Sequence, residues 1–367
     1  MEQQDLQYKI GLTLLHGVGP RKASLLVAKM GSPEAVFREK LSVIQYKTGI
    51  SRHVLQSMKR EEALRLSEKH SEYILKKGFG THYFLDANYP RRLRQIHDAP
   101  IMLYSMGNVD LNPSRALAIV GTRNSTPYGK ELCDSFVSGL KDAKIQVVSG
   151  MAYGIDICAH NACVRDQIST IGVLGHGLDR IYPSVHKRTA QLMLENGGLL
   201  TEFLPGTKPD RENFPMRNRI VAGMTDATII IESKETGGSL ITAELAFDYN
   251  REVFAFPGNI GQVYSAGCNK LIATNKAQLI TDANDVLRYM GWNAHPTMKS
   301  SAAAKLFHDL TDEEKNLVDY LSEEPAHVDM IALHLRIPVS KINFLLLNLE
   351  MKGVLRAQAG NMYSITQ

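Results

Sequence analysis

Seven short apolar runs between residues 115 and 290 constrain the fold more than any other feature of this chain. Several are apolar throughout, without the alternation of a half-exposed strand, and they cover 116–120, 145–148, 170–174, 198–201, 227–231, 253–256 and 278–280. Such runs are typical of strands that are buried on both faces of a parallel sheet. Helical segments between the runs supply the crossovers, so the sequence predicts a doubly wound α/β domain with a mostly parallel sheet.

Residues 1–80 have helical spacing and no strand pattern. Apolar residues recur at helical intervals through Ile10, Leu14 and Leu25, and the segment 17–20, Gly-Val-Gly-Pro, interrupts them. A proline in this place is suited to the first position of the next helix. This part of the chain is therefore predicted to be an all-α domain.

The last 60 residues predict a small domain of three helices and a hairpin. The helices are expected at 310–322, 328–335 and 340–352, and the hairpin strands at 354–357 and 362–365. Thr311 followed by Glu314 has the spacing of a capping box. This order of elements favours a winged helix. The predicted organisation is a helical domain at 1–80, an α/β domain at 81–292, a linker at 293–304 and a winged-helix domain at 305–367.

The net charge of +4 is unevenly distributed along the 367 residues. Residues 1–100 hold 17 Lys and Arg against 10 Asp and Glu, which gives +7; residues 101–304 hold 19 of each; residues 305–367 hold 6 against 9, which gives −3. An exposed basic segment favours anionic partners such as nucleic acid, although a solvated helix surface has the same composition.

Composition and motifs also exclude several classes. No apolar run approaches the roughly 18 residues of a transmembrane helix, and the first residues do not have the pattern of a signal peptide. The four cysteines are scattered and form no CxxC pair, which argues against a disulfide scaffold or a zinc site and favours a reducing cytosol. We therefore expect a cytoplasmic protein with no membrane partner, no metal and no cofactor.

Small turns follow most of the predicted strands, and ligands of doubly wound sheets bind at these carboxyl ends. After the first run comes Gly121-Thr122-Arg123, where glycine allows a close backbone approach and arginine offers a bidentate phosphate donor. Gly238-Ser239 opens a helix after the fifth run, and Lys270 follows the sixth. A single turn of this kind is ordinary, but the set predicts an extended anionic ligand or a phosphate-bearing nucleotide.

The segment 213–219, Asn-Phe-Pro-Met-Arg-Asn-Arg, places Arg217 and Arg219 two residues apart beside Phe214. Arginine for phosphates and an aromatic ring for base stacking are the components of single-strand binding. The competing interpretation is a loop whose Phe214 is buried in the core.

Asp156 and His160 are four residues apart, so they share a helix face and resemble an acid/base pair. No nucleophile accompanies them, which favours a capping aspartate and a hydrogen-bonded histidine. The sequence has no GxSxG elbow and no set of residues with metal-ligand spacing. These absences favour binding over catalysis.

Six segments together resemble the DNA-processing protein A family, also called DprA or Smf. In chain order they read GTRNSTPYG (121–129), SGMAYGIDICAH (149–160), GHGLDRIYP (175–183), NFPMRNRIVAG (213–223), GGSLITA (237–243) and FPGNI (256–260). The resemblance covers about residues 105–290. It implies an extended Rossmann-like fold that binds single-stranded DNA without catalysis, protects incoming strands during natural transformation and helps load the recombinase RecA. It also implies a homodimer formed through the Rossmann-like domain.

Carried over to this chain, the resemblance implies a DNA-binding set: Gly121, Thr122, Arg123, Phe214, Arg217, Asn218, Arg219, Gly238, Ser239 and Lys270. The cations Arg123, Arg217, Arg219 and Lys270 are expected to contact phosphates. Phe214 is expected to stack on a base or to shape the pocket, and the glycine turns to add backbone donors.

The terminal domains leave alternatives open. The N-terminal LLHGVGPRKASLLV resembles a helix-hairpin-helix of a SAM-like domain, in which the same turn serves either DNA contact or packing. The expected third helix of the winged-helix domain is rich in Leu and has few basic residues, whereas a helix that reads DNA needs polar and basic side chains. For that domain we expect protein contact or self-packing.

Two other functions compete with DNA binding. Gly237, Gly238 and Glu244 faintly echo the PGGxGTxxE motif of Rossmann-like phosphoribohydrolases, although Thr236 stands in place of the proline and the Gly-Thr pair is absent. A nucleotide-processing enzyme of that kind is the alternative. The third possibility is an interaction adaptor whose basic turns have no ligand.

Overall fold

The computed structural model describes all residues except 1, 293–309, 323–324, 359 and 366–367. The predicted linker at 293–304 lies outside these described residues. The chain divides into two compact units, Met1–Thr281 and Asp282–Gln367. Each unit is described separately below.

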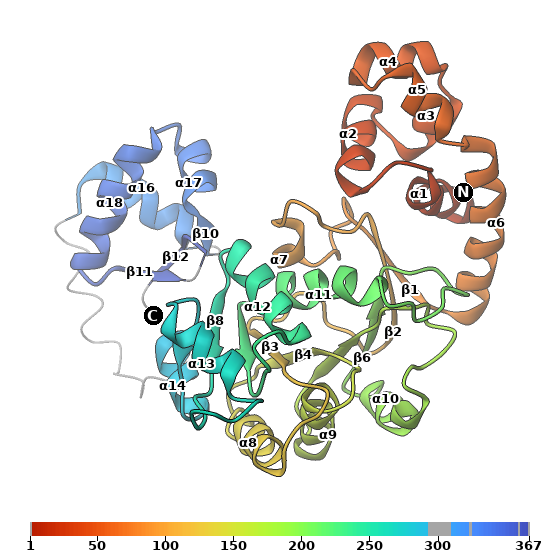
Figure 1. Ribbon diagram of the computed structural model, residues 1–367. Helices are drawn as coiled ribbons and strands as arrows, with labels where there is room; N and C mark the ends of the chain where they lie inside the picture. The colour runs from red at the N-terminus through yellow and green to blue at the C-terminus, as the bar shows by residue number, and fades with distance from the viewer. Residues whose placement is uncertain (1, 293–309, 323–324, 359, 366–367) are drawn as a thin grey trace. The chain divides into compact units, whose positions relative to one another are not determined.

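A nine-stranded sheet forms the centre of the first unit, in the order β1-β2-β6-β5-β4-β3-β7-β8-β9 (Figure 1). Its strands are β1 Gly80–Tyr83, β2 Met102–Gly107, β3 Ala116–Val120, β4 Gln146–Gly150, β5 Thr170–Val173, β6 Gly197–Thr201, β7 Ala227–Ile230, β8 Glu252–Ala255 and β9 Gln278–Leu279. From β6 across the sheet to β9, each strand pairs in parallel with the next one. The prediction of a doubly wound, mostly parallel α/β sheet is confirmed, and every predicted run contains a strand.

The sequence patterns missed β1 and β2, which pair antiparallel with each other and add to β6 at one edge of the sheet. β2 is buried along most of its length, but the segment between Tyr83 and Met102 contains only the one-turn helix α7 (Arg91–Arg94). Without a crossover helix to mark them, these strands had no alternating β/α pattern in the sequence.

Helices cover both faces of the sheet. On one face lie α8 (Pro127–Ser138), α9 (Ile155–Asp166) and α10 (Lys187–Met193), and on the other lie α7, α11 (Asn213–Gly223) and α12 (Gly238–Asp248) (Figure 1). The chain moves from β3 through β4 and β5 to β6, then returns to β7 on the other side of β3. Such a reversal of strand order leaves a crevice at the carboxyl ends of the central strands. Helix α13 (Ala266–Ala273) connects β8 to β9.

The N-terminal helices share an apolar core with the sheet edge. They are α1 Glu2–Leu14, α2 Pro20–Met30, α3 Pro33–Arg38, α4 Leu41–Thr48, α5 Arg52–Ser57 and α6 Arg60–Lys77. Leu6 and Ile10 of α1 belong to the same buried cluster as Met102 and Tyr104 of β2. The all-α prediction for this part is confirmed, and the helices are attached to the sheet through apolar contact.

The second unit contains α14 (Ala283–Tyr289), then α16 (Asp312–Leu321), α17 (Val328–Leu335) and α18 (Val339–Met351), with a small sheet in the order β10-β12-β11. Its strands are β10 (Ala326–His327), β11 (Leu355–Gln358) and β12 (Met362–Ile365). The predicted capping box is present, because the Thr311 hydroxyl accepts from the Glu314 N–H and the Glu314 carboxylate accepts from the Thr311 N–H at 2.8 Å. The predicted three helices and hairpin are confirmed.

Within the described residues, no single helix has both the length and the apolarity to cross a membrane. The helices α17 and α18 reach that composition only when they are taken together, and they meet at 112°.

Candidate nucleic-acid interface

A pocket of about 100 Å³ lies at the carboxyl ends of β3, β4 and β5, where the strand order reverses. Its lining comes from three strand-end loops and the first turns of α11: Arg123, Met151, Ala152, Tyr153, Val173, Leu174, Gly175, His176, Tyr182, Pro183, Phe214 and Arg217. The turn after β3, the turn after β5 and the segment 213–219 therefore meet at one place, as the sheet topology requires.

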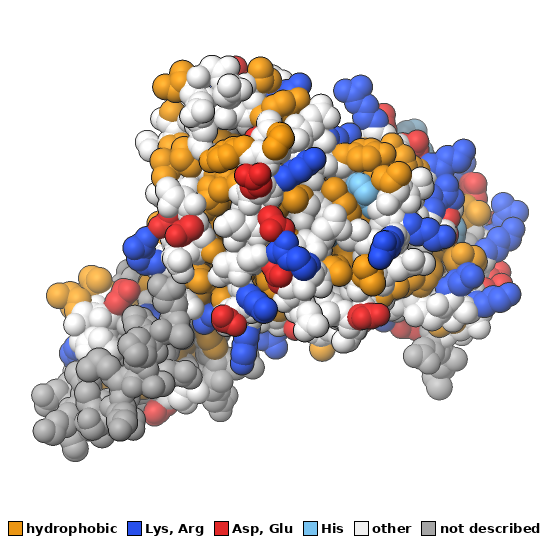
Figure 2. Space-filling model, turned by 90° about the horizontal axis from the view of Figure 1, so that it is seen from below, with side chains coloured by type: hydrophobic (Ala, Val, Ile, Leu, Met, Phe, Trp, Pro, Cys, Tyr) orange, Lys and Arg blue, Asp and Glu red, His pale blue; other side chains and the backbone are white. Residues whose placement is uncertain are grey.

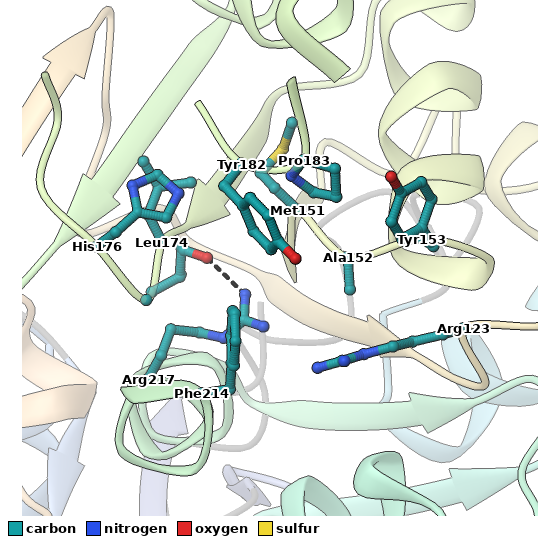
Figure 3. A pocket seen from close by; sticks show the side chains of 12 residues that line it. Arg123, Met151, Ala152, Tyr153, Leu174, His176, Tyr182, Pro183, Phe214 and Arg217 are labelled. Carbon is teal, nitrogen blue, oxygen red and sulfur yellow. Dashed lines mark hydrogen bonds between the residues drawn. The ribbon is translucent and has the colours of Figure 1, made fainter. Parts of the chain in front are cut away.

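An arginine and two aromatic rings form one side of this pocket. The Arg123 guanidinium lies over the Phe214 ring, 5.2 Å from its centroid, and the Tyr182 ring is 6.3 Å from that of Phe214 at 35°. Figure 3 shows Arg123 extending toward Phe214, with Tyr182 and Ala152 on the opposite side of the cavity. The arrangement places an exposed positive charge beside aromatic surface, which suits a phosphate and a base together.

The side chain of Arg217 forms the floor of the pocket and is almost fully buried. Its Nη1 donates to the Val173 carbonyl at 2.6 Å, and its Nε donates to the Asn218 side-chain oxygen at 3.1 Å (Figure 3). Burial lowers the pKa of Arg217, and the charge of Asp156 opposes that shift. A side chain at Gly150 would collide with the Arg217 guanidinium, so this strand end requires glycine. Arg217 thus has a fixed position that sequence patterns do not reveal.

Asp156 and His160 lie beneath the pocket and do not line it. Asp156 is buried, which raises its pKa, while Arg217 opposes that shift. His160 is fully buried, with Nδ1 at 2.8 Å from the Thr170 hydroxyl oxygen, and that hydroxyl donates to the Val147 carbonyl. Because the hydroxyl proton is already used, His160 donates from Nδ1. These contacts agree with the hydrogen-bonded histidine that the sequence favoured over an acid/base pair.

His160 makes the stability of this protein sensitive to mild acid. Burial lowers its pKa to about 3, so between the ordinary value of 6.5 and about 3 the unfolded chain binds a proton that the folded chain does not. The free energy of unfolding therefore falls as pH falls through this window, by about 1.4 kcal/mol per pH unit for this group, and is unaffected by it above pH 6.5. Urea unfolding at pH 7, 6 and 5 should give a shallower slope for His160→Gln than for the wild-type chain. Equal slopes would contradict this assignment.

Arg219 is a correction to the predicted set. Its side chain is 8% exposed and forms an ion pair with Glu202, and it also donates to the Asp98 carbonyl. The segment 213–219 is the start of helix α11, and residues two apart on a helix face nearly opposite directions, about 200° apart. Arg217 therefore faces the pocket, whereas Arg219 faces the layer between α11, α7 and β6. Arg219 does not line the pocket, and its guanidinium is engaged by Glu202 and by the Asp98 carbonyl, so its position does not support the predicted phosphate contact.

Two predicted residues flank the pocket without lining it. Gly121 lies against Ile155, where a side chain would clash, and the Thr122 N–H donates to the Glu232 carbonyl at 2.7 Å. These contacts hold the turn after β3 in the position from which Arg123 extends.

Asn218 does not line the pocket either, and its side-chain oxygen accepts from the Arg217 Nε. The other three predicted residues lie at the ends of β7 and β8, outside the pocket. Gly238 is the first residue of α12, and a Cβ added there would have no neighbouring atom within 4 Å. Ser239 is buried and donates to the Ser233 hydroxyl at 2.8 Å, while Lys270 pairs with Glu235 at 3.0 Å. The structure therefore separates the predicted set into a pocket group, with Arg123, Phe214 and Arg217, and this second group.

Sequence reasoning missed Tyr153, His176 and Tyr182 as pocket residues. All three lie in the strand-end segments 149–160 and 175–183, but no charge or aromatic cluster in the sequence distinguishes them. Tyr153 and Tyr182 are each about half exposed, at 49% and 47%. An aromatic residue three positions after a predicted parallel strand was a signal for Tyr153, whereas Tyr182 lies nine residues beyond β5 and had none.

The surface away from the pocket has a mixed charge. Seen from below in Figure 2, Lys and Arg side chains stand among Asp and Glu side chains across the middle of the molecule. Among the described residues, no group of three or more His, Cys, Asp or Glu is placed to hold a metal ion. No continuous basic surface extends over the face in that view.

Two family models match the chain. The model described as DNA recombination-mediator protein A matches residues 81–291, and the model described as DprA winged helix domain matches residues 301–361. Together they span both units of the structure.

Curated relatives and solved structures give the same similarity. Protein Smf of Synechocystis is 32% identical over 311 residues, covering 76% of this chain and 78% of the relative, and DNA processing protein DprA of Streptococcus pneumoniae is 40% identical over 209 residues, covering 57% and 73%. The crystal structure of the pneumococcal protein covers 77% of this chain and 97% of its own, with 35% identity and a TM-score of 0.67. A structure of DNA processing protein A from Helicobacter pylori, described by its single-stranded DNA binding mode, covers 59% and 97%, with 29% identity and a TM-score of 0.54.

Proposed function

The chain belongs to the DNA recombination-mediator protein A family, and from that premise we propose that it binds single-stranded DNA in the pocket at the ends of β3, β4 and β5, without catalysis. The observation that carries the proposal is the Arg123 guanidinium over the Phe214 ring, at the mouth of a cavity floored by Arg217. The similarity to a Helicobacter pylori protein described by its single-stranded DNA binding mode supports it.

Each group in the pocket has a separate task in this proposal. Arg123 is exposed and pairs with a backbone phosphate, because its planar donors match phosphate oxygens. Phe214 and Tyr182 offer ring surface to an unstacked base, and stacking accepts any base sequence. Arg217 adds positive charge at the floor, where its contact with Val173 holds it in place.

The second group of predicted residues, at the ends of β7 and β8, would bind the same DNA strand beyond the pocket. The first turn of α12, which begins at Gly238, has backbone N–H groups that no helical carbonyl accepts, and Lys270 lies nearby through its pair with Glu235. A phosphate next to the one at Arg123 would be stabilised there. Ser239 positions this turn through its bond to Ser233 and is not itself a ligand.

The biological role that we propose follows from the family. In this role the protein is a cytoplasmic homodimer formed through the Rossmann-like domain that protects incoming single strands and helps load the RecA recombinase in natural transformation and homologous recombination. The division into a helical domain at 1–80, a Rossmann-like domain at 81–292 and a winged-helix domain at 305–367 is part of the same proposal.

The nucleotide-processing alternative depends on Glu244, and the contacts of Glu244 do not favour it. Its side chain is 60% exposed on α12 and lies 3.7 Å from the Lys276 ammonium, and it does not line the pocket. A carboxylate that acts on a bound nucleotide must reach the reacting atoms. Release of a free base from a nucleoside monophosphate, abolished by Glu244→Gln, would restore the enzyme hypothesis.

A salt titration tests the proposed function directly. We expect the protein to bind a polythymidine strand more tightly than a duplex of the same length, because a duplex does not offer an unstacked base to Phe214 and Tyr182. The logarithm of the affinity should fall linearly with the logarithm of salt concentration, by about 0.7 for each phosphate contact. Equal affinity for single strand and duplex, measured by fluorescence anisotropy, would refute the proposal.

A further inference from the structure

We propose a second binding site for the same DNA strand in a groove between α2, α7 and the segment that follows β1. This inference rests on the proposed function and adds a contact that the pocket at the strand ends does not include. The groove has a volume of about 440 Å³ and shares no lining residue with that pocket. We call it the interdomain groove; its lining is Pro20, Arg21, Ser24, Phe84, Leu85, Tyr89, Arg94, Ile96, His97 and Ala99.

Two arginines give the interdomain groove its charge. Arg21, in the first turn of α2, and Arg94, at the end of α7, are both exposed. Within the described parts of the chain neither forms an ion pair, and no acidic residue lines the groove. Asp86 and Asp98, which adjoin lining residues in the sequence, bind other groups: Asp86 accepts from Lys9 at 3.3 Å, and Asp98 accepts from the Tyr249 hydroxyl at 2.8 Å. The lining of the groove therefore carries two arginine charges and no carboxylate, which favours an anionic occupant.

The walls of the groove provide apolar and aromatic surface between these arginines. Leu85 is 60% exposed, Phe84 is half-buried, and the exposed His97 ring stands edge-on to Tyr249 at 5.8 Å. Isolated phosphate or a small anion does not need such surface. Cations interleaved with flat side chains are what a single nucleic-acid strand requires, because phosphates and bases alternate along it.

Hydrogen bonds connect the two sides of the groove and fix its arginines. The Arg21 Nε donates to the His97 carbonyl at 3.3 Å, which connects α2 to the loop after α7. Arg94 donates to the Asp86 carbonyl at 2.6 Å and lies over the Tyr89 ring, and the Tyr89 hydroxyl donates to the Pro100 carbonyl at 2.6 Å. The Arg21 bond uses Nε alone, so its two terminal nitrogens remain available to a phosphate.

Both arginines of the groove belong to the basic first 100 residues of the chain. The first 100 residues have an excess of seven positive charges, whereas the residues that supply the strand-end pocket come from a segment with none. A DNA strand that extends from the pocket to the groove would contact the arginines of both sites. Only a strand long enough to span the two sites can gain from the second one.

Charge reversal at Arg21 tests this inference with a matched control. Arg21→Glu changes a residue in the first turn of α2, where an acidic side chain is favourable to the helix, so folding should be retained. Arg65→Glu makes the same change on an exposed position of α6 that does not line the groove. We expect Arg21→Glu to weaken binding of a polythymidine strand of about 40 nucleotides by about tenfold and to lower its salt slope by about 0.7 or more, with less than a twofold effect of Arg65→Glu.

Strand length separates this inference from the proposed function. A polythymidine of about six nucleotides fills the pocket alone, so Arg21→Glu should bind it as the wild-type chain does, whereas Arg123→Ala should lose affinity at both lengths. Equal binding of the long strand by Arg21→Glu and Arg65→Glu would overturn the groove and leave the pocket intact. Failure of the wild-type chain to bind either strand would refute both, and an equal loss by Arg21→Glu at both lengths would show that the groove is not a separate site.

Discussion

Replacing Arg123 with alanine is expected to weaken binding of single-stranded DNA by about 10- to 100-fold. The variant loses a charge-assisted hydrogen bond to phosphate, which contributes about 1.5–3 kcal/mol. It also removes the cation that lies 5.2 Å from the centroid of the Phe214 ring. Each 1.4 kcal/mol corresponds to a tenfold change in affinity, which sets the expected range. Fluorescence anisotropy with a labelled polythymidine strand at fixed salt measures it.

Two further variants make this result specific. Arg123→Lys keeps the charge but not the planar donor group, so it should retain part of the affinity and show an intermediate loss. Arg65→Ala removes an exposed arginine of α6, outside the pocket, and should bind as the wild-type chain does. If Arg123→Ala and Arg65→Ala bind equally well, the pocket is not the DNA site.

Replacing Arg219 with alanine is expected to destabilise the protein by about 3–5 kcal/mol without changing the DNA affinity of the folded chain. Arg219 and Glu202 form an ion pair in which the two side chains are 8% and 12% exposed. Removing one partner leaves a buried carboxylate without compensation, and this penalty is what sets the size of the loss. Urea unfolding measures the stability, and anisotropy at low temperature measures the affinity.

A double variant separates the ion pair from the packing around it. Arg219→Met combined with Glu202→Leu replaces both charges by apolar groups of similar size, so its stability should lie closer to that of the wild-type chain than that of Arg219→Ala. A stable Arg219→Ala variant with impaired DNA binding would return Arg219 to the interface, against the burial described above.

The strand-end turns show how far sequence reasoning extends. Arg123 follows a continuous apolar run, so its place at the carboxyl end of a buried strand was predictable from local pattern. Phe214 was recognised from its arginine neighbours, and it lines the pocket as expected of that segment. Tyr182 has no such neighbours, and only the approach of two distant turns brings its ring within 6.3 Å of Phe214.

The segment 213–219 shows where the same reasoning stops. Viewed as a loop with two arginines side by side, it predicted two phosphate contacts. As the first turns of α11, it points Arg217 toward Val173 and Arg219 toward Glu202. Whether these residues coil into a helix, and how that helix is rotated on the sheet, depends on packing against β4 and β5, which no local pattern encodes.

By itself, the sequence determined the parallel sheet and its strand ends and predicted an anionic ligand, because buried strands and glycine turns leave a local pattern of composition and periodicity. The tertiary structure decided which side chains meet. It selected Arg217 over Arg219 by the rotation of one helix, and brought Tyr182 and Phe214 together across about 30 residues of chain. It also brought Arg21 and Arg94, which are 73 positions apart in the basic first 100 residues, to the lining of one groove beside α7. Contacts between residues far apart in the chain depend on how the elements pack, and packing is a property of the whole fold.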